Sequence, residues 1–313
     1  MITAENLTKR YGSKTAVDEV SFTIRPGLVT GFLGPNGAGK STTMRMIVGL
    51  HRPTSGSVTI DGRPYADLES PLTEVGILLD ARAYHPGRSA RDHLRALGAT
   101  HRVGRKRVDE VIALAGLESV AGKRAGGFSL GMGQRLGIAA ALLGDPHTLI
   151  LDEPVNGLDP EGVIWVRRLA RSLAAEGRTV FLSSHLMSEM AQTADHVIVL
   201  GRGRVIADAP IAEFTARASG TAVRVRSPRG TELADSLRRG GLDVAEQTDG
   251  ALLVTGTTAE AIGDFAARHA VPLHELTPVK SSLEEAYLEL TRDEVEYHSG
   301  AVDAAATSEG ANE

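Results

Sequence analysis

Short apolar runs alternate with turn-forming residues at the start of the chain, and this pattern predicts a β-rich region. Residues 1–6, 57–60 and 74–79 read as strands, and Asp61-Gly62 reads as a turn. Residues 28–33 form a compact apolar run typical of a buried strand, whereas residues 42–50 have helical spacing. The segment between these two runs must therefore turn the chain from a strand into a helix.

The hydrophobic pattern changes twice in the following residues. Strand signals vanish from residue 89 to 143, and apolar side chains in residues 107–117 recur at helical spacing, which predicts a helical insertion at about 86–143. Apolar runs at 148–151, 179–182 and 196–200 then alternate with helical segments, the first of which opens with Pro160. This alternation favours a mostly parallel sheet with α/β architecture.

A second unit follows a predicted helix at 211–218 and the turn-prone Ser219-Gly220. Its strands are expected at 223–225, 242–246, 251–255 and 271–276, and its helices at 232–239 and 259–268. This βαββαβ order is that of the α+β ferredoxin-like split βαβ arrangement. We expect domains at 1–218 and 219–292, the latter closing with a helix at 281–291, and a disordered tail at 293–313.

Composition narrows the functional classes. The chain has 313 residues, of which 42% are hydrophobic and 23% charged, which is typical of a globular protein of about two domains. Its net charge is −5 with basic and acidic residues interspersed, so nucleic acid is not expected as a partner. Cysteine is absent, which excludes disulfides and thiol chemistry and fits a reducing cytoplasm. No secretion signal opens the chain and no apolar run approaches the ~18 residues of a membrane span, so any membrane role should be peripheral.

The turn between the runs at 28–33 and 42–50 has the pattern G-x-x-x-x-G-K-[ST] of a phosphate loop. Glycines there allow the backbone N–H groups to form one anion-binding nest. Lys40 is placed to neutralise β- and γ-phosphates, Ser41 offers a hydroxyl to Mg²⁺, and the helix N-terminus faces the anion. The alternative is a Gly-rich turn that caps an ordinary helix, and the order strand, loop, helix makes it unlikely. A nucleoside triphosphate site is predicted.

Two further groups of polar residues lie just after predicted apolar strands. Asp152 and Glu153 directly follow the strand at 148–151, where buried carboxylates need a cation or a proton. Asp152 would hold Mg²⁺ through water and Glu153 would reach a water in line with the γ-phosphate; the alternative is an acidic surface turn. His185 follows the strand at 179–182, on the edge where open α/β sheets bind ligands.

Residues 128–135 precede a helical run, and Ser129 can cap its start. From these residues alone, the favoured interpretation of the segment is an ordinary capped helix. The functional alternative is a second anion-binding helix N-terminus.

Together these residues resemble the ATP-binding cassettes of ABC transporters. The family's motifs occur in its order across residues 1 to about 215: the phosphate loop, Ser129-x-Gly131 with Gln134-Arg135, residues 151–154, residues 157–160, and Ser184-His185. Residues 281–290 are similar to the C-terminal extension of cassettes that serve drug-resistance exporters of the daunorubicin and bacitracin type. The resemblance implies a P-loop NTPase cassette with a mixed sheet, an antiparallel β part and a helical insertion, followed by the small α+β domain.

The resemblance also implies roles for matching positions. Tyr11 would stack on adenine with Val17 nearby, although a Tyr at a strand edge is an equally good interpretation. Ser129 and Gly131 would cover the γ-phosphate of ATP held by a second subunit, and Asp159 would communicate between the two sites. Glu153 would be the general base and His185 the γ-phosphate sensor. The expected phosphate-loop contacts are Gly34, Asn36, Gly37, Ala38, Gly39, Lys40, Ser41 and Thr42.

Two departures from the family pattern stand out. Asp80 occupies the place of the usual Gln, so it can meet Mg²⁺ through water but lacks the amide donor for the attacking water. Leu130 replaces the first glycine of the signature and Met132 its usual Gln.

The function implied is that of an ATPase subunit that uses ATP and Mg²⁺ and dimerises head to tail with a second copy. It would lie at the cytoplasmic face of the membrane and drive a separate permease that exports a drug or other hydrophobic compound, with antibiotic resistance as the outcome. Permease coupling is expected at the helical insertion and at residues 80–89. A cassette acting in DNA repair or translation is an alternative, opposed by the single cassette and the absence of a long coiled coil. A non-catalytic regulator is opposed by intact Glu153 and His185.

Overall fold

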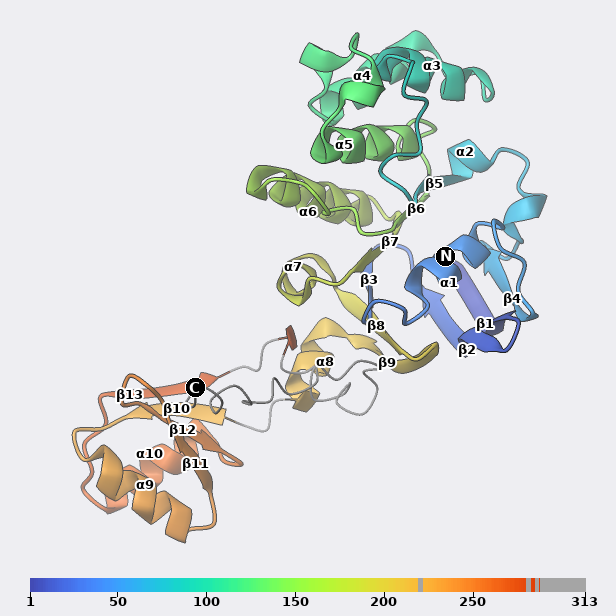
Figure 1. The fold of residues 1–313 in the computed structure, drawn as a ribbon. Helices are drawn as coiled ribbons and strands as arrows, with labels where there is room; N and C mark the ends of the chain where they lie inside the picture. The colour runs from blue at the N-terminus through green and yellow to red at the C-terminus, as the bar shows by residue number, and fades with distance from the viewer. Residues whose placement is uncertain (219–221, 280–282, 285–286, 288–313) are drawn as a thin grey trace, which may run out of the picture.

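The computed structural model describes residues 1–218, 222–279, 283–284 and 287, and the strands in these residues form three sheets (Figure 1). The first sheet is antiparallel, in the order β2-β1-β4, and the second has six strands in the order β5-β6-β7-β3-β8-β9. All neighbours in the second sheet are parallel except β8 and β9. The strands are β1 (Ile2–Tyr11), β2 (Lys14–Ile24), β3 (Val29–Leu33), β4 (Ser55–Ile60), β5 (Val75–Leu78), β6 (Thr148–Leu151), β7 (Thr179–Ser184), β8 (His196–Gly201) and β9 (Arg204–Pro210). The predicted β-rich start and the predicted α/β alternation are both confirmed.

The middle of the six-stranded sheet is buried on both faces. Every residue of β3, β6 and β7 is buried, as expected for parallel strands covered by helices. Three aromatic rings join this sheet to the antiparallel one: Phe32 lies 5.1 Å from Phe181 and 5.9 Å from Phe22 between ring centroids. This apolar layer holds the two sheets together.

Helices cover the sheet and form the predicted insertion (Figure 1). The insertion contains α3 (Ala90–Ala99), α4 (Arg105–Leu114) and α5 (Leu130–Ala141), which pack through the fully buried Leu94, Val111 and Leu136. None of the described helices combines the length and apolar character needed to cross a bilayer. The other helices of the first 218 residues are α1 (Lys40–Ile47), α2 (Pro71–Glu74), α6 (Pro160–Ala175), α7 (Met187–Thr193) and α8 (Ile211–Ala218), with 3₁₀ turns at Tyr65–Asp67, Glu118–Val120 and Ala125–Gly127.

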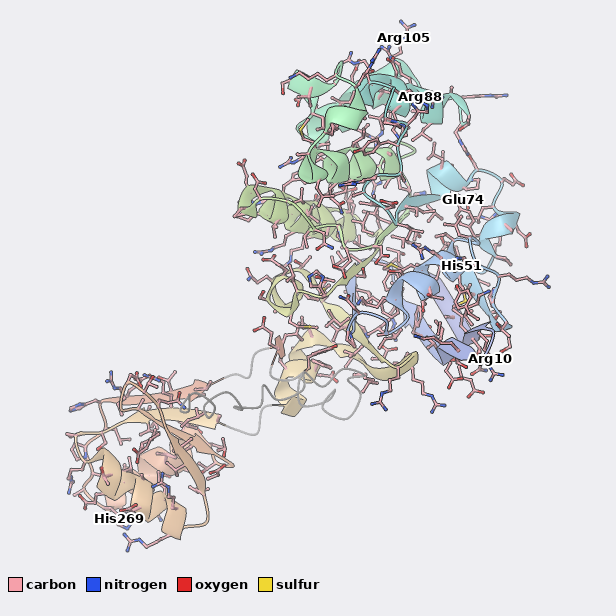
Figure 2. The ribbon with its side chains drawn as sticks, viewed as in Figure 1. Arg10, His51, Glu74, Arg88, Arg105 and His269 are labelled. Atoms are coloured by element: carbon pink, nitrogen blue, oxygen red, sulfur yellow. The ribbon has the colours of Figure 1, made fainter. Side chains whose placement is uncertain are left out.

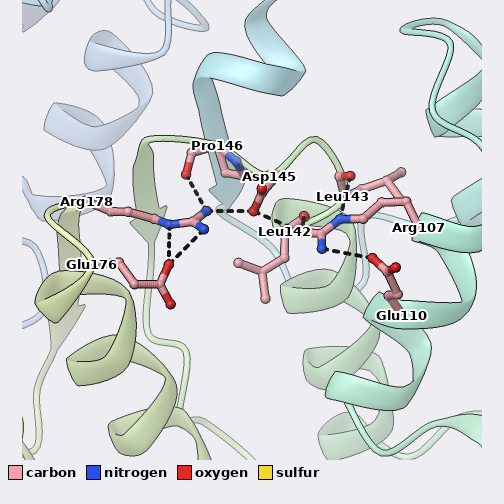
Figure 3. A network of polar contacts seen from close by, with 8 residues as sticks. All are labelled: Arg107, Glu110, Leu142, Leu143, Asp145, Pro146, Glu176 and Arg178. Atoms are coloured by element: carbon pink, nitrogen blue, oxygen red, sulfur yellow. Dashed lines mark hydrogen bonds and ion pairs between the residues drawn. The ribbon is translucent and has the colours of Figure 1, made fainter.

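One polar network fastens the insertion to the sheet (Figure 3). Asp145, in the turn between α5 and β6, accepts hydrogen bonds from Arg107 of α4 at 3.2 Å and from Arg178 before β7 at 2.8 Å. Arg107 also donates to the carbonyl of Leu142 at 2.7 Å, and Arg178 to Glu176 at 2.9 Å. The hydrogen bond from Arg178 is the main cause of the lowered pKa of Asp145. The end of α5 is thereby tied to two other elements.

The C-terminal part has its own four-stranded antiparallel sheet, ordered β11-β12-β10-β13, with two helices (Figure 1). Its elements are β10 (Ala222–Arg226), α9 (Gly230–Arg239), β11 (Asp243–Glu246), β12 (Leu252–Thr255), α10 (Ala259–Arg268) and β13 (Glu275–Val279). The predicted βαββαβ order is confirmed. Val223, Val225, Leu233 and Val254 are buried in a separate hydrophobic core.

The last strand of this sheet lies further along the chain than predicted. The pattern placed it at 271–276, but β13 begins at Glu275. Ala270 adopts a left-handed φ of 52° and the Val271 N–H donates to the Ala266 carbonyl at 2.9 Å. These two residues therefore terminate α10 in a Schellman-type turn, and the apolar Val271 closes that turn instead of starting a strand.

Only fragments of the chain beyond β13 belong to the described residues. Residues 283, 284 and 287 are helical, in agreement with part of the helix expected at 281–291, while the rest of that helix and the expected tail at 293–313 lie outside the described residues. Leu283 and Tyr287 are buried in the hydrophobic core of the first 218 residues, which also contains Phe214 of α8. The chain thus returns to the core of the first 218 residues after the second sheet.

His93 should make the stability of the protein depend on pH. It is 6% exposed on α3, its Nδ1 has no hydrogen-bond partner among the described residues, and burial together with Arg88 (Figure 2) and His85 lowers its pKa. The unfolded chain therefore binds a proton more readily than the folded chain once the pH falls below about 6.5. We expect the free energy of unfolding, measured with urea, to fall as the pH drops from 7 to 5, and to fall less in His93→Phe.

The exposed His274 provides a matched control, because His274→Phe should retain the slope of the parent protein. Identical slopes for His93→Phe and the parent would show that His93 does not contribute.

Candidate functional site

Strand register brings three of the predicted motifs to one edge of the six-stranded sheet. Leu33 at the end of β3 pairs with Ser184 of β7, and Leu151 at the end of β6 pairs with Leu182 of β7. Because these strands are parallel, the phosphate loop, Asp152 and His185 all leave the sheet at its C-terminal edge.

The phosphate loop is a tight backbone turn pressed against its neighbours. Gly34, Gly37 and Gly39 have φ values of 155°, 86° and 106°. A Cβ at Gly39 would lie 2.5 Å from the Ala16 carbonyl oxygen, and a Cβ at Gly34 would lie 2.6 Å from that of Leu200. No side chain caps the start of α1, so its first N–H groups are free to bind an anion.

Lys40 lies against the loop that it follows. Its ammonium donates to the carbonyls of Gly34 at 2.6 Å and Pro35 at 3.3 Å, and the side chain is buried. Burial lowers the pKa of Lys40, and the negative charges of Glu153 and Asp152 partly oppose this shift. Lys40 is thus a desolvated cation near two carboxylates, an arrangement that suits a phosphate on the side of Lys40 and a metal cation on the side of the acids.

A cavity of about 360 Å³ opens over the loop. Three of the expected contacts at the loop are not part of its lining: Gly34 and Ala38 are buried, and Val17 is fully buried against Gly39. The predicted residues that line it are Tyr11, Asn36, Gly37, Gly39, Lys40, Ser41, Thr42 and Glu153.

Ser183, which the sequence did not single out, joins the two acids. Its hydroxyl donates to the Asp152 carboxylate at 2.5 Å and accepts from the Glu153 N–H at 2.9 Å, and the side chain is fully buried. Glu153 has a left-handed φ of 50°, a strained conformation for a residue with a side chain. The contact from Ser183 helps to hold this conformation.

Glu153 has two further partners. Its carboxylate lies 2.8 Å from Nδ1 of His185, and its carbonyl accepts a hydrogen bond from Gln134 of α5 at 3.0 Å. Gln134 is 2% exposed, so this second contact is shielded from solvent. The predicted pair of Glu153 and His185 is therefore assembled, and the helix that begins at Ser129 supports it.

The oxygen donors at this edge suit a metal that is bound mainly by nucleotide phosphates. Among the described residues no cluster of three or more His, Asp or Glu side chains could hold a metal ion alone. Ser41 and Asp152 supply a hydroxyl and a carboxylate, the donors that Mg²⁺ takes together with phosphate and water. Asp80 is not in this lining: its carboxylate accepts from the Arg82 N–H at 2.8 Å, and it lies in a separate groove.

The predicted signature residues also lie outside the phosphate-loop cavity. Ser129 is the N-cap of α5 and accepts from the Met132 N–H at 3.2 Å. A Cβ at Gly131 would lie 2.8 Å from the Gly157 carbonyl oxygen, and Asp159 caps α6 through the Gly162 N–H at 2.9 Å. The starts of α5 and α6 therefore meet, and they carry Ser129, Gly131 and Asp159 on a surface apart from their own phosphate loop.

Comparisons with known proteins agree with this geometry. The family model described as "ABC transporter" matches residues 17–156, and a domain of unknown function matches residues 221–284. The bacitracin transport ATP-binding protein of Bacillus licheniformis is 43% identical over 213 residues, covering 67% of this chain and 70% of that protein. An uncharacterized ABC transporter ATP-binding protein of Bacillus subtilis is 34% identical over 301 residues, covering 94% and 97%. A solved dimeric ATP-binding cassette bound to ADP and Pi superposes with a TM-score of 0.62 at 26% identity, covering 67% of this chain and 99% of that one.

Removing the Ser183 hydroxyl should slow phosphate release from ATP. Ser183→Ala leaves the Glu153 N–H and one Asp152 oxygen without their buried partner, a loss worth about 1–3 kcal/mol, so we expect kcat to fall about ten-fold or more. Ser184→Ala is the matched control, because the buried Ser184 hydroxyl accepts a hydrogen bond from the Leu186 N–H at 2.9 Å, away from both acids. Equal rates for Ser183→Ala and the parent would contradict the role of Ser183.

Proposed function

Because this chain belongs to the ABC transporter family of ATP-binding cassette ATPases, we propose that it powers a separate membrane permease from the cytoplasmic face of the membrane. The observation that carries the proposal is the assembly of Lys40, Asp152, Glu153 and His185 at one sheet edge. The bacitracin and lantibiotic transport proteins among its relatives support export of a drug or another hydrophobic compound.

The contacts at this edge support a role in hydrolysis for each residue. The N–H groups of the phosphate loop and Lys40 would bind the β- and γ-phosphates, and Ser41 and Asp152 would hold Mg²⁺, which would neutralise charge on those phosphates. Glu153 accepts the proton of the attacking water. His185, 2.8 Å from the Glu153 carboxylate, orients that carboxylate and meets the γ-phosphate.

Hydrolysis in this proposal requires a second copy of the chain. Ser129 and Gly131 do not line the cavity of their own phosphate loop. A head-to-tail pair would bring these residues onto the ATP of the partner, with Asp159 between the two sites. The dimeric cassette that superposes on this chain supports the arrangement. ATP contacts on both faces would favour the closed pair, and loss of the γ-phosphate would release it.

A groove of about 480 Å³ supports the expected permease contact near residues 80–89. Its lining is mostly apolar and comes from β5, α2 and the helical insertion, including Leu72, Leu79, Tyr84 and Leu97. Asp80 lies on its rim, and the usual Gln of the family is replaced there by a carboxylate whose oxygen accepts from Arg82. We propose that a cytoplasmic segment of the permease inserts here, so Asp80 is positioned to respond to it.

The same proposal includes the division into domains at 1–218 and 219–292. The separate hydrophobic core of the second sheet and its helices supports this division for residues 222–279, whereas Leu283 and Tyr287 lie in the core of the first 218 residues.

Glu153→Gln should abolish turnover and leave ATP binding intact. The amide cannot accept the proton of the attacking water, so we expect phosphate release to fall at least about 100-fold. ATP should then accumulate in a stable dimer, measured by size-exclusion chromatography with and without ATP. The exposed Glu161→Gln should behave like the parent protein. Phosphate release at the parent rate in Glu153→Gln would rule out this residue as the base.

The permease contact can be tested with single cysteines, because the chain has none of its own. Ala83 lines the groove and is exposed, so a photo-crosslinker attached to Ala83→Cys should capture membrane protein from vesicles that contain the permease. The exposed Ala267→Cys on α10 is the control position. Equal capture from both positions would remove the assignment of the groove.

A further inference from the structure

Tyr11 is an exposed aromatic residue at the cavity of the phosphate loop. It is the last residue of β1, it is 47% exposed, and it lines the same cavity as Lys40 and Ser41. An exposed aromatic side chain at a strand end has rotamer freedom, which costs free energy when a ligand immobilises it.

Two side chains restrict that freedom. The Tyr11 hydroxyl lies 2.8 Å from Nδ1 of His51, with the two rings 6.0 Å apart between centroids and inclined at 78°. The Lys9 ammonium lies 5.1 Å from the centroid of the Tyr11 ring and donates to the Arg52 carbonyl at 2.7 Å. One face of the ring is thus covered by a cation and its hydroxyl end is held by an imidazole, so the second face remains for a ligand.

The segment that supplies these contacts is continuous with the helix of the phosphate loop. His51 follows the end of α1, and its N–H donates to the Arg45 carbonyl at 3.1 Å. The Thr54 N–H donates to Thr8 of β1 at 2.8 Å, which anchors the segment beside Tyr11. Figure 2 shows His51 on the part of the molecule that holds the antiparallel sheet and α1. α1 therefore begins next to the phosphate nest, and the segment that follows its end carries His51 to Tyr11.

The surroundings of His51 favour its neutral form. Burial, Arg45 and Lys9 all lower its pKa below the ordinary value of a histidine. The imidazole is therefore a hydrogen-bond partner of Tyr11 and not another cation beside Lys9.

We propose that His51 is a positioning residue that holds the Tyr11 ring ready to stack on the base of the nucleotide, with Lys9 fixing the opposite face. The inference rests on the proposed nucleotide site and extends it to a residue outside the cavity. Because the phosphate nest directly precedes α1 and His51 follows it, base and phosphates would be recognised by one continuous segment of the chain.

The test compares a ligand that has a base with one that lacks it, and uses ADP and inorganic pyrophosphate so that nothing is hydrolysed. Affinities are measured by isothermal titration calorimetry on the full chain. His51→Ala and Tyr11→Phe should each weaken ADP binding about three- to ten-fold, and the double variant should be no weaker than either single variant, since both remove the same hydrogen bond. Pyrophosphate affinity should not change. His51→Asn, which keeps a polar atom near the position of Nδ1, should recover most of the ADP affinity, and the exposed His147→Ala should match the parent.

Tyr11→Ala separates this inference from the proposed site. If Tyr11→Ala binds ADP as tightly as the parent, Tyr11 is not the base contact and that part of the proposed site is wrong. If Tyr11→Ala weakens ADP binding but Tyr11→Phe and His51→Ala do not, the site stands and the role of His51 is refuted. Additive losses in the double variant would also refute the role of His51, because His51 would then act independently of the Tyr11 hydroxyl. An equal loss of pyrophosphate affinity in His51→Ala would refute it too, because His51 would then act through the phosphate loop.

Discussion

The site depends above all on the register of three parallel strands. β7 lies between β3 and β6, and the pairs Leu33 with Ser184 and Leu151 with Leu182 set how far each strand extends before it enters the site. Side chains alternate between the faces of a strand, so a shift of one residue would turn Ser183 away from both acids. The apolar, fully buried strands make such a shift costly, because it would displace a continuous set of packed side chains. Core packing thus sets the geometry of the polar edge.

The sequence was informative where function is local and less so where it depends on tertiary contacts. The phosphate loop and the acids after β6 could be predicted because each motif is a short stretch with its own backbone or solvation requirement. Ser183 and His51 could not, since their contacts with Asp152 and Tyr11 join residues 31 and 40 positions apart. The only signal for Ser183 was a polar end on an apolar strand, which also fits an ordinary strand terminus. The start of β13 was predicted too early for a related reason. The apolar Val271 closes the C-terminal turn of α10 and does not begin a strand.

The helix α5 illustrates how one element can belong to two sites. Its first turn exposes Ser129 and Gly131 away from the phosphate loop of the same chain, while Gln134 points inward to the Glu153 carbonyl. Its far end is fastened through Leu142 and Asp145 to Arg107 and Arg178 (Figure 3). A displacement of the first turn of α5 would therefore act on the backbone of Glu153, through Gln134, before it acts on the anchored end of the helix.

Leu283 and Tyr287 are buried in the same hydrophobic core as Phe214, which changes how the second sheet is connected to the cassette. The second sheet is not an appendage at the end of a finished cassette but a loop between two parts of one core. A truncation after α8 would remove core side chains along with the sheet, and would expose apolar surface that the full chain covers. Excision of residues 222–279 with a short linker would keep both parts of that core, which makes it the cleaner way to isolate the cassette.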